Sequence, residues 1–343
     1  RMKMSKIVTF GEIMLRLAPK GYLRFLQEPE FQATFGGGEA NVAVSLANYG
    51  LDAAFVTKLP ENPIGEAAIR ELRKYGVDVG GISTGGSRIG IYYLEKGASQ
   101  RPSKVVYDRA HSAIGESCRD DFDWNEIFKD AGWFHFTGIT PALGPNVAEI
   151  CKDAVKEAKK RNITVSCDLN FRKNLWTSEQ AAETMGELMK YTDVCIANEE
   201  DAEKVFGIKA DATDINAGKL NRNGYKDVAR KLIERFDLDY AAITLRTSIS
   251  ASDNKWAAML YHDGQAIFSK EYSVHIVDRV GGGDSFGAGL IYGLYTGMDD
   301  TEALEFATAA SCLKHSIEGD FNLVSVKEVK ALAGGDGSGR VQR

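Results

Sequence analysis

The sequence predicts an α/β fold with a mainly parallel sheet and helices on both of its faces. Three observations carry this prediction. Short apolar runs typical of buried strands alternate with longer amphipathic stretches typical of helices. Glycines follow three of these stretches, at Gly50, Gly76 and Gly207, where helices commonly end. The chain has 343 residues, 44% hydrophobic and 26% charged, which is enough apolar material for one large domain.

Each element is placed by its own pattern. Strands are predicted where apolar residues run together, at Ile7–Ile13, Ala53–Leu59, Trp133–Ile139, Thr164–Leu169, Val194–Ala197 and Tyr240–Leu245. Helices are predicted where apolar residues recur with helical spacing, at Ala40–Tyr49, Ile64–Tyr75, Val147–Lys160, Ser178–Lys190 and Asp227–Phe236. Two further runs, Lys255–His262 and Ala266–Tyr272, flank Asp263-Gly264, a typical hairpin turn, and predict antiparallel strands. The polar stretch Asp211–Asn223 predicts a loop.

Residues 14–35 and 88–112 break this alternation. They contain short β-prone pieces, such as Ile89–Glu95 and Lys104–Asp108, without helical spacing. We expect these two segments to form a small antiparallel flap, here called the lid, which projects from the main sheet and covers a site at the strand ends. The alternative is that these two segments protrude from the surface without a function.

The lid belongs to a single domain predicted over residues 1–333. The Gly/Ser-rich residues 334–343 predict a disordered tail or a cloning remnant.

Composition and charge limit the class of partner. The chain carries 42 basic and 48 acidic residues, a formal net charge of -6, with no long run of one sign, so neither a nucleic acid nor a membrane is an expected partner. Five cysteines without C-x-x-C spacing suggest neither a disulfide framework nor a zinc site. No apolar run approaches the roughly 20 residues needed to cross a bilayer, and the first residues lack the apolar core of a signal peptide. We expect a cytoplasmic protein that acts on a small molecule.

The most informative segment is Gly281-Gly282-Gly283-Asp284, which leads into a helical pattern. Successive glycines let backbone N–H groups turn toward one point, and a glycine loop before a helix N-terminus is typical of an anion site. The aspartate can take a proton from a substrate hydroxyl while the glycine amides hold phosphoryl oxygens. A helix cap is the alternative role for Asp284, although a cap does not require three preceding glycines.

This segment resembles the second signature of the ribokinase/PfkB carbohydrate kinases, D-T-x-G-A-G-D. Asp278 and Asp284 match it, while Arg279 replaces the usual threonine and Gly282 the usual alanine. The form Asp-Arg-Val-Gly-Gly-Gly-Asp is similar to that of the ketodeoxygluconate kinase branch. The resemblance covers nearly the whole chain, and it implies a ribokinase-like fold with a lid that often pairs with another subunit, giving a homo-oligomer.

An earlier glycine cluster resembles the first signature of the same family, G-G-x-x-x-N-x-A. The resemblance implies that Gly36, Gly37 and Asn41 surround sugar hydroxyls, and an asparagine amide can both donate and accept the hydrogen bonds this needs. A polar residue near an ordinary helix N-terminus is the alternative for Asn41.

The second lid segment is similar to the lid of ketodeoxygluconate kinases, in which a tyrosine and an arginine two residues later meet the acid sugar. These map onto Tyr107 and Arg109, with Tyr93 as a further contact. A guanidinium suits a carboxylate because it binds one with two parallel hydrogen bonds. Packing within a sheet is the alternative role for the tyrosines.

Two more substrate contacts are implied by the resemblance. Arg172 follows a predicted strand, the position at which α/β proteins place ligands, and would lie between the sugar acid and the nucleotide phosphates. Asp320 corresponds, by its spacing from Asp284, to an acid that contacts the substrate. A surface arginine is the alternative for Arg172.

The nucleotide side is implied by resemblance as well. Asn198 and Asp201 belong to an element similar to the family's N-x-x-E, associated with hydrated magnesium and phosphate, although acids at a helix N-terminus are common for dipole reasons alone. Either Asp201 or Glu200 is the candidate that organises Mg²⁺. The remaining expected ATP contacts are Asn170, Thr244, Arg246 and the glycines Gly281 and Gly283.

The resemblance therefore implies transfer of a phosphoryl group from ATP to the 6-hydroxyl of 2-keto-3-deoxygluconate. Mg²⁺ is the expected metal cofactor, and a monovalent cation such as K⁺ is a further candidate. Another sugar kinase such as a fructokinase is the nearest alternative, separated by whether the substrate must carry a carboxylate. A non-catalytic sugar-binding regulator would leave Asp284 behind three glycines unexplained. A nicotinamide-dependent dehydrogenase would need G-x-G-x-x-G after the first strand, where Gly11 stands alone.

Overall fold

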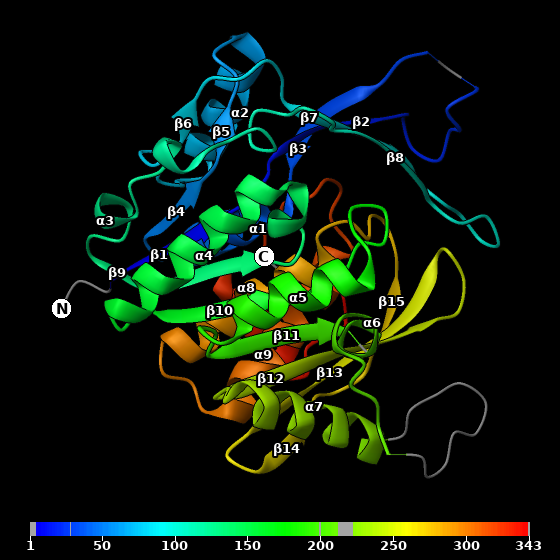
Figure 1. The fold of residues 1–343 in the computed structure, drawn as a ribbon. Helices are drawn as coiled ribbons and strands as arrows, with labels where there is room; N and C mark the ends of the chain where they lie inside the picture. The colour runs from blue at the N-terminus through cyan, green and yellow to red at the C-terminus, as the bar shows by residue number, and fades with distance from the viewer. Residues whose placement is uncertain (1–4, 28, 199, 212–221, 342–343) are drawn as a thin grey trace.

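The fold is described from a computed structural model, which places residues 5–27, 29–198, 200–211 and 222–341 (Figure 1). A nine-stranded sheet forms its centre in the order β14-β13-β12-β11-β10-β9-β1-β4, with β15 paired to β13. Neighbours from β4 to β12 run parallel and those from β12 onward antiparallel. The strands are β1 (Lys6–Phe10), β4 (Ala53–Val56), β9 (Ala131–Thr137), β10 (Thr164–Asp168), β11 (Val194–Asn198), β12 (Tyr240–Ser248), β13 (Asp253–His262), β14 (Gln265–Phe268) and β15 (Tyr272–His275).

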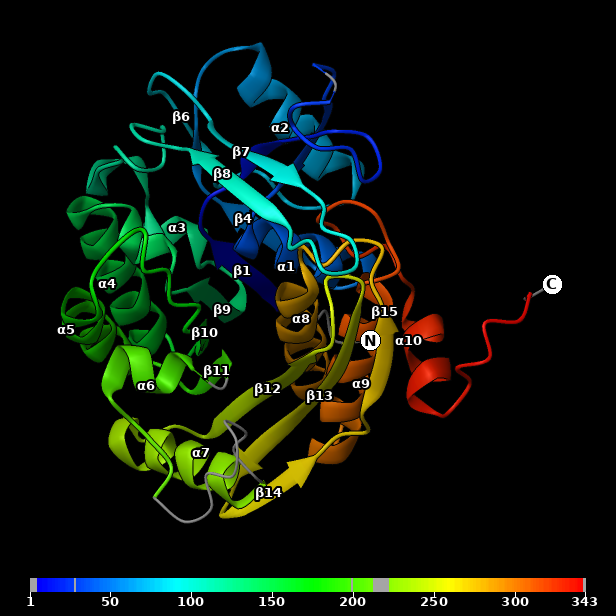
Figure 2. The ribbon, with the colours of Figure 1, turned by 90° about the vertical axis from the view of Figure 1, so that its right-hand side faces the viewer.

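Helices cover both faces of this sheet, as the sequence predicted. Side chains along each strand alternate between the two faces, so Val8 of β1 packs with one group of helices and Ile7 with the other. The first face carries α3 (Trp124–Ile127), α4 (Pro145–Lys160), α5 (Ser178–Met189), α6 (Asp201–Phe206) and α7 (Arg222–Phe236). The second carries α1 (Gly38–Asn48), α8 (Gly282–Tyr295) and α9 (Asp300–Lys314), with α10 (Val326–Ala333) packed outside α9 (Figure 2).

The predicted lid is confirmed as a second sheet of four strands, β3-β2-β7-β8, that stands over one end of the central sheet (Figures 1 and 2). Its members are β2 (Met14–Ala18), β3 (Gln32–Gly36), β7 (Gly90–Glu95) and β8 (Lys104–Asp108). The outer pairs are antiparallel as expected, but β2 and β7 are parallel. This difference arises because the chain passes through β4 and α2 (Pro63–Lys74) between them, and such a crossover returns a strand in the same direction.

The hairpin that ends the lid reaches back to the main body. Ser99, in the turn between β7 and β8, accepts a hydrogen bond from the amide of Ala251 (2.8 Å), and its own amide donates to the Ser252 hydroxyl (2.9 Å). Lys96 forms an ion pair with Glu318 at 2.7 Å. The lid is therefore fixed to the β12–β13 turn and to the chain after α9.

A few elements differ from the sequence prediction. The single strand predicted at Ala53–Leu59 is interrupted after Val56, and β5 (Lys58–Leu59) pairs with β6 (Ser83–Thr84) in a sheet of its own. The strand predicted at Ala266–Tyr272 divides into β14 and β15. Helix α9 was not predicted because small and apolar residues line most of its circumference, so it has no polar stripe to mark it.

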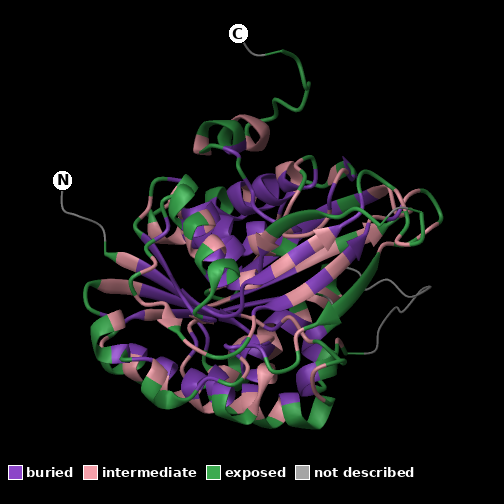
Figure 3. Ribbon diagram, turned by 90° about the horizontal axis from the view of Figure 1, so that it is seen from above, coloured by how far each residue is buried: buried purple, intermediate pink, exposed green. Residues whose placement is uncertain are grey.

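Burial follows this architecture. The central sheet and the inner faces of the helices are buried, whereas β8 and the end of the chain are exposed (Figure 3). Two short 3₁₀ turns connect elements: η1 (Arg119–Asp121), which has no buried residue, and η2 (Thr140–Leu143), whose first two residues are buried. Most of the predicted loop at 211–223 lies outside the described residues. No helix in the described part of the chain is long and apolar enough to cross a membrane.

Candidate active site

The glycine run forms a tight turn into α8, beneath the lid and beside the carboxyl ends of the parallel strands. Gly281 has φ 84°, in the left-handed region that favours glycine, and α8 starts at Gly282. A Cβ on Gly281 would lie 2.2 Å from the carbonyl oxygen of Asp320, so the turn also needs glycine for close backbone packing. The predicted glycine loop at a helix N-terminus is present.

Asp284 occupies the first turn of α8 and is half-buried. Its Oδ2 accepts a hydrogen bond from Asn41 Nδ2 at 2.8 Å. Burial raises the pKa of Asp284 from its ordinary value to about 6, while the hydrogen bond from Asn41 and the positive charge of Arg172 act in the opposite direction. A carboxylate with this pKa is ionised at neutral pH and can still accept a proton.

The three glycine amides are not equivalent. The N–H of Gly282 donates to the carbonyl of Arg279 (3.2 Å), and its predicted contact with a phosphoryl oxygen stays a prediction. Gly283 is exposed and lies in the first turn of α8, where backbone N–H groups have no acceptor within the helix. An anion at this loop would therefore bind mainly to the first amides of α8 from Gly283 onward.

The first glycine cluster is needed for close packing, which the sequence did not predict. A Cβ on Gly36 would lie 2.1 Å from Asp320 Oδ2, and one on Gly37 would lie 1.9 Å from the carbonyl oxygen of Glu12. Both glycines thus allow close packing around the site, and their predicted contacts with sugar hydroxyls stay a prediction.

Asn41 is already engaged within the protein. Its Oδ1 accepts from the amide of Gly37 (3.2 Å), and its Nδ2 donates to Asp284 and, at 3.5 Å, to Asp320. The side chain is buried. Asn41 thus orients the carboxylate of Asp284, and its predicted contact with the sugar stays a prediction.

Asp320 lies at the centre of a buried polar network. Its Oδ1 accepts from Arg16 Nη1 (3.0 Å) and from the Tyr92 hydroxyl (2.5 Å), and Arg16 Nη2 also donates to Asp278 Oδ2 (2.6 Å). Because Arg16 and Tyr92 belong to the lid, the network joins the lid to the glycine loop and, through Asn41, to Asp284. The predicted role of Asp320 at the site thus gains a second component, since it also fixes the lid.

The lid tyrosine at the network is Tyr92, not the predicted Tyr93. Successive side chains of a strand point to opposite faces, and β7 places Tyr92 beside Arg16 of β2, whereas Tyr93 lies beside Leu17 and packs against the ring of Phe31. The substrate contact predicted for Tyr93 stays a prediction, and Tyr92 is a residue of this network that the sequence did not single out. The local sequence does not show which of two adjacent tyrosines in such an apolar run faces the network.

Arg109 follows β8, and its guanidinium lies beside Tyr107 and Glu12. Its guanidinium stacks on the ring of Tyr107 at 4.2 Å, and its Nη1 lies 3.8 Å from Glu12 Oε2. Nε and Nη1 of Arg109 and both carboxylate oxygens of Glu12 are buried and have no hydrogen-bond partner among the described residues. Burial raises the pKa of Glu12 to about 7, against the positive charge of Arg109. The sequence prediction did not include Glu12.

A second group of charges gathers at the ends of β10 and β11. Arg172 is exposed in the loop after β10, and its positive charge acts on Asp168, Asp201 and Asp284. Burial raises the pKa of Asp168 well above its usual range, and the carboxylates of Asp201 and Asp284 raise it further. Asn170 has φ 36° and its amide donates to Asp168 (3.2 Å). Arg172 therefore lies within electrostatic reach of Asp284, and its predicted place between sugar and phosphates stays a prediction.

The Asn198 element is hydrogen-bonded to the backbone at the start of α6. Asn198 Oδ1 accepts from the amides of Glu200 (2.8 Å) and Asp201 (2.9 Å). Asp201 is buried, and its two oxygens accept from the amides of Phe171 (3.2 Å) and Asn198 (3.1 Å). Both oxygens of Asp201 thus accept hydrogen bonds from the backbone, and its role in organising Mg²⁺ stays a prediction. Glu200 is exposed and pairs with Lys204.

The other predicted nucleotide contacts lie side by side. Thr244 of β12 is the register partner of Asn198 on β11, and Arg246 follows two residues later with its side chain exposed. Burial, and next the charge of Arg246, lowers the pKa of Arg279, whose Nη2 donates to the carbonyl of Ala251 (3.2 Å). Two neighbouring guanidinium groups repel each other, so an anion such as a phosphate chain would stabilise this region.

Metal ligands do not form a ready site in the described part of the chain. No group of three or more His, Cys, Asp or Glu side chains there has the arrangement to hold a metal ion. A divalent cation at this site would accordingly depend on oxygens brought by a ligand.

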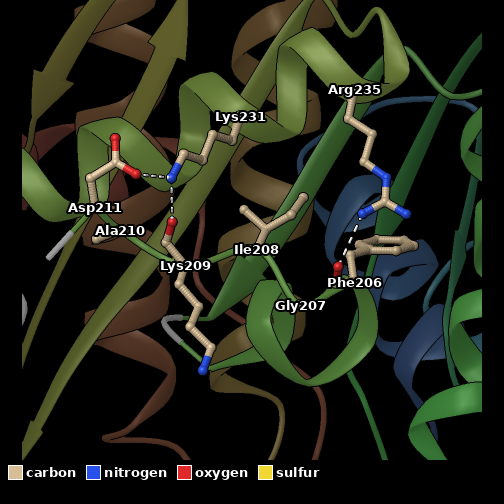
Figure 4. A pocket seen from close by; sticks show the side chains of 8 residues that line it. All are labelled: Phe206, Gly207, Ile208, Lys209, Ala210, Asp211, Lys231 and Arg235. Atoms are coloured by element: carbon tan, nitrogen blue, oxygen red, sulfur yellow. Dashed lines mark hydrogen bonds and ion pairs between the residues drawn. The ribbon is translucent and has the colours of Figure 1, made fainter.

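A separate hollow lies between α6 and α7 and is not part of this site. It is lined by Phe206, Gly207, Ile208, Lys209, Ala210, Asp211, Lys231 and Arg235 (Figure 4). Its wall is held by hydrogen bonds from Lys231 to Asp211 and to the Lys209 carbonyl, both 2.7 Å, and from Arg235 to the Phe206 carbonyl. Each of its charged side chains has a partner: Lys231 pairs with Asp211, Lys209 with Glu203, and Arg235 with a backbone carbonyl. We assign this pocket no function.

Comparison with known proteins gives one consistent result. The model of the "pfkB family carbohydrate kinase" matches residues 4–323. A crystal structure of 2-dehydro-3-deoxygluconokinase from Thermotoga maritima superposes with a TM-score of 0.92 at 55% identity, covering 96% of this chain and 98% of that one. A 2-dehydro-3-deoxygalactonokinase from Haloferax volcanii is 31% identical over 333 residues, 97% of this chain and 98% of its own. A putative ribokinase II from E. coli in complex with ATP and Mg²⁺ shares the fold, with a TM-score of 0.79 at 20% identity, covering 95% and 98% of the two chains.

Proposed function

Because this chain belongs to the pfkB family of carbohydrate kinases, we propose that it transfers the γ-phosphoryl group of ATP to the 6-hydroxyl of 2-keto-3-deoxygluconate. The products would be 2-keto-3-deoxy-6-phosphogluconate and ADP.

The observation that carries the choice of substrate is the guanidinium of Arg109. Its side chain is only 12% exposed, and its Nε and Nη1 are buried without a hydrogen-bond partner among the described residues. A buried unpaired donor is costly, so the site favours a ligand that supplies acceptors. A carboxylate offers two oxygens in the geometry of the guanidinium fork, and a neutral sugar does not.

The names of the relatives support an acid sugar as well. The Thermotoga maritima protein is a 2-dehydro-3-deoxygluconokinase and the Haloferax volcanii protein a 2-dehydro-3-deoxygalactonokinase. Both substrates carry a carboxylate next to a keto group and differ in the configuration of one hydroxyl. We place the gluconate form first because the relative with that name has the higher identity over the whole chain.

In the proposed mechanism Asp284 removes the proton from the attacking 6-hydroxyl, and Asn41 holds its carboxylate in place. The bond from the γ-phosphorus to the β,γ-bridging oxygen of ATP breaks as the bond to the sugar oxygen forms, and the proton remains on Asp284. Amides at the start of α8 and the cation of Arg172 stabilise the charge on the transferring oxygens. Arg109 binds the sugar carboxylate.

The nucleotide would lie along Thr244 and Arg246. Support comes from the adjacent guanidinium groups of Arg246 and Arg279, which favour a polyanion, and from the related E. coli fold with ATP and Mg²⁺. Mg²⁺ would neutralise charge on the β- and γ-phosphates. Since the described side chains do not assemble a site for it, it would be held largely by those phosphates.

We also propose that the chain forms a homo-oligomer through its lid. Strand β8 is the edge of the lid sheet, and its apolar residues Val105, Val106 and Tyr107 are 42%, 52% and 45% exposed. An exposed apolar edge strand is a site where proteins pair with another strand or cover it.

The experiment that tests the proposed function is an assay of ADP release with Mg·ATP and each of five sugars. These are 2-keto-3-deoxygluconate, 2-keto-3-deoxygalactonate, fructose, ribose and gluconate. The expected result is the highest kcat/KM with ketodeoxygluconate. A preference for fructose or ribose would contradict the acid-binding role of Arg109, and a preference for ketodeoxygalactonate would revise only the stereochemistry.

A further inference from the structure

Lys314, the last residue of α9, is fully buried, which is exceptional for a lysine. Its Nζ donates to the carbonyl oxygen of Asp278 (3.2 Å) and to that of Ile317 (2.9 Å). Both acceptors are uncharged backbone oxygens. A lysine that only caps a helix C-terminus can keep its ammonium group in water, so full burial requires another reason.

The ammonium group lies directly under the glycine loop. Asp278 is three residues before Gly281, and a Cβ on Gly281 would lie 3.4 Å from Lys314 Cε. The amides of Val277 and Asp278 both donate to the carbonyl of His315, the residue after Lys314. The segment before the glycines and the turn after α9 are thus joined around this one cation.

The charges that face Lys314 come from several elements. The carboxylates of Asp278, Asp320 and Asp284 attract it, while the guanidinium of Arg16 repels it. Burial, which is the larger influence, lowers the pKa of Lys314 to about 8. Around neutral pH the ammonium form is therefore retained, and it partly balances an excess of buried negative charge beside Asp284.

Carbonyl oxygens that point at one enclosed positive charge are also the ligands that proteins offer to a bare potassium ion. An ammonium group has the same charge, and its N–H groups donate to the oxygens that would otherwise coordinate an ion. Lys314 differs in being covalently attached and in contacting two such carbonyl oxygens.

We propose that Lys314 Nζ acts as a built-in monovalent cation that positions the glycine loop at the start of α8, so that this enzyme needs no free potassium ion. Lys314 is a positioning residue, because its contacts are with the loop and not with the reacting atoms. The proposal rests on the proposed function only in using phosphoryl transfer as one of its two measurements.

The experiment compares the wild-type enzyme with Lys314→Ala and Lys314→Met in KCl, NH₄Cl or tetramethylammonium chloride at equal ionic strength. The sugar is the one that gives the highest turnover. Wild-type kcat is expected to be the same in all three salts. Lys314→Ala is expected to lose roughly tenfold or more of kcat in tetramethylammonium chloride, as when a loop that stabilises charge is misplaced, and to regain activity in KCl or NH₄Cl. Lys314→Met is expected to stay impaired in every salt, because its side chain fills the space.

Lys330→Ala, at an exposed position on α10, is the control and should match the wild type. A wild-type enzyme that requires K⁺ would overturn the proposal without any variant. Full activity of Lys314→Met would also overturn it, as would loss in Lys314→Ala that neither K⁺ nor NH₄⁺ restores.

A second measurement does not depend on any substrate. The thermal unfolding midpoint of Lys314→Ala should be higher in KCl than in tetramethylammonium chloride, while that of the wild type should not differ between the two. Equal midpoints for the variant would count against the cation site even if no sugar in the panel were phosphorylated. Failure of the proposed function and failure of this inference are thus separable.

Discussion

Asp284 combines two features that a general base needs. It is ionised at neutral pH, and burial raises its pKa to about 6, which strengthens it as a proton acceptor relative to an ordinary aspartate. Asn41 supplies a hydrogen bond that fixes its orientation. The proton-accepting oxygen and the first amides of α8 are therefore held on the same helical turn.

We predict that Asp284→Asn retains sugar binding but lowers kcat by about 100-fold or more, because an amide cannot take the proton. In the wild type, kcat/KM should fall as pH drops below 6, since the protonated form of Asp284 is inactive as a base. Steady-state kinetics across pH 5 to 8 and sugar binding by calorimetry check both. Asp120→Asn, at an exposed site, is the control. An unchanged kcat in Asp284→Asn would remove the base assignment.

Arg109 and Glu12 lie close together, and both have polar atoms that a substrate could bind. The closest charged atoms are 3.8 Å apart, and neither group completes its hydrogen bonds within the described protein. An acid sugar would provide acceptors to Arg109, and its hydroxyls would provide donors to Glu12. This complementarity gives the site a chemical preference that a neutral pocket would lack.

We predict that Arg109→Ala raises KM for ketodeoxygluconate by about 100-fold, in keeping with the loss of a charged hydrogen-bonded pair. KM for a neutral ketose should change little. The matched control is Arg88→Ala, another lid arginine, whose guanidinium is paired with Asp108 at the surface (2.8 Å). Equal effects of Arg109→Ala on acid and neutral sugars would show that Arg109 does not read the carboxylate.

At the scale of elements, the glycine loop and α8 depend on backbone approach. Gly281 needs its left-handed conformation and the space beside the Asp320 carbonyl, whereas a Cβ on Gly283 would meet nothing within 4 Å. The same loop is also tied to α9 by the Ser311 hydroxyl, which donates to the Gly282 carbonyl (2.6 Å). Two adjacent segments therefore hold one turn in a fixed shape.

We predict that Gly281→Ala lowers the free energy of unfolding by about 1–3 kcal/mol from backbone strain alone, with a further loss from the clash with Asp320. Gly283→Ala should leave stability unchanged or slightly improved, because alanine favours the helix and meets no neighbour. Denaturant unfolding of the two variants makes the comparison. Similar stability of both would mean that the turn tolerates a side chain at Gly281.

The lid is an element whose position is fixed at several points. Tyr92 and Arg16 join it to Asp320, and the hairpin around Ser99 contacts the β12–β13 turn. Arg279, two residues before the glycine loop, also donates to the Ala251 carbonyl in that turn, so the lid hairpin and the glycine loop are held to the same turn. This arrangement suits a cover that excludes water during phosphoryl transfer.

At the scale of the whole molecule, the exposed β8 edge leads to a prediction about assembly. Val106→Asp should weaken self-association, because a charge at an apolar strand edge opposes pairing with a second edge. Ile64→Asp is the control, since Ile64 is also an exposed apolar residue, 45% exposed, but lies on α2. Sedimentation velocity over a range of concentrations measures the change. An oligomer equally stable in Val106→Asp would place its interface elsewhere, and a monomeric wild type would contradict the proposed assembly.

The sequence by itself determined the class of fold, the order of strands and helices and the identity of the two glycine clusters with Asp284. These features are local. The hydrophobic periodicity of a segment indicates which of its faces is buried, and a run of glycines indicates an unusual backbone conformation. The same locality explains why a lid was predicted, since its segments lack helical spacing.

Only the tertiary structure decided which side chains meet. Asn41 and Asp284 are 243 positions apart, and Arg16 and Asp320 are 304 apart, so their contacts follow from crossovers and not from neighbouring residues. The choice of Tyr92 over Tyr93 depends on the phase of one strand, which alternation within an apolar run does not fix. Burial of Lys314 beneath the glycine loop likewise appears only when α9 packs against α8, because burial is a property of the assembled layers.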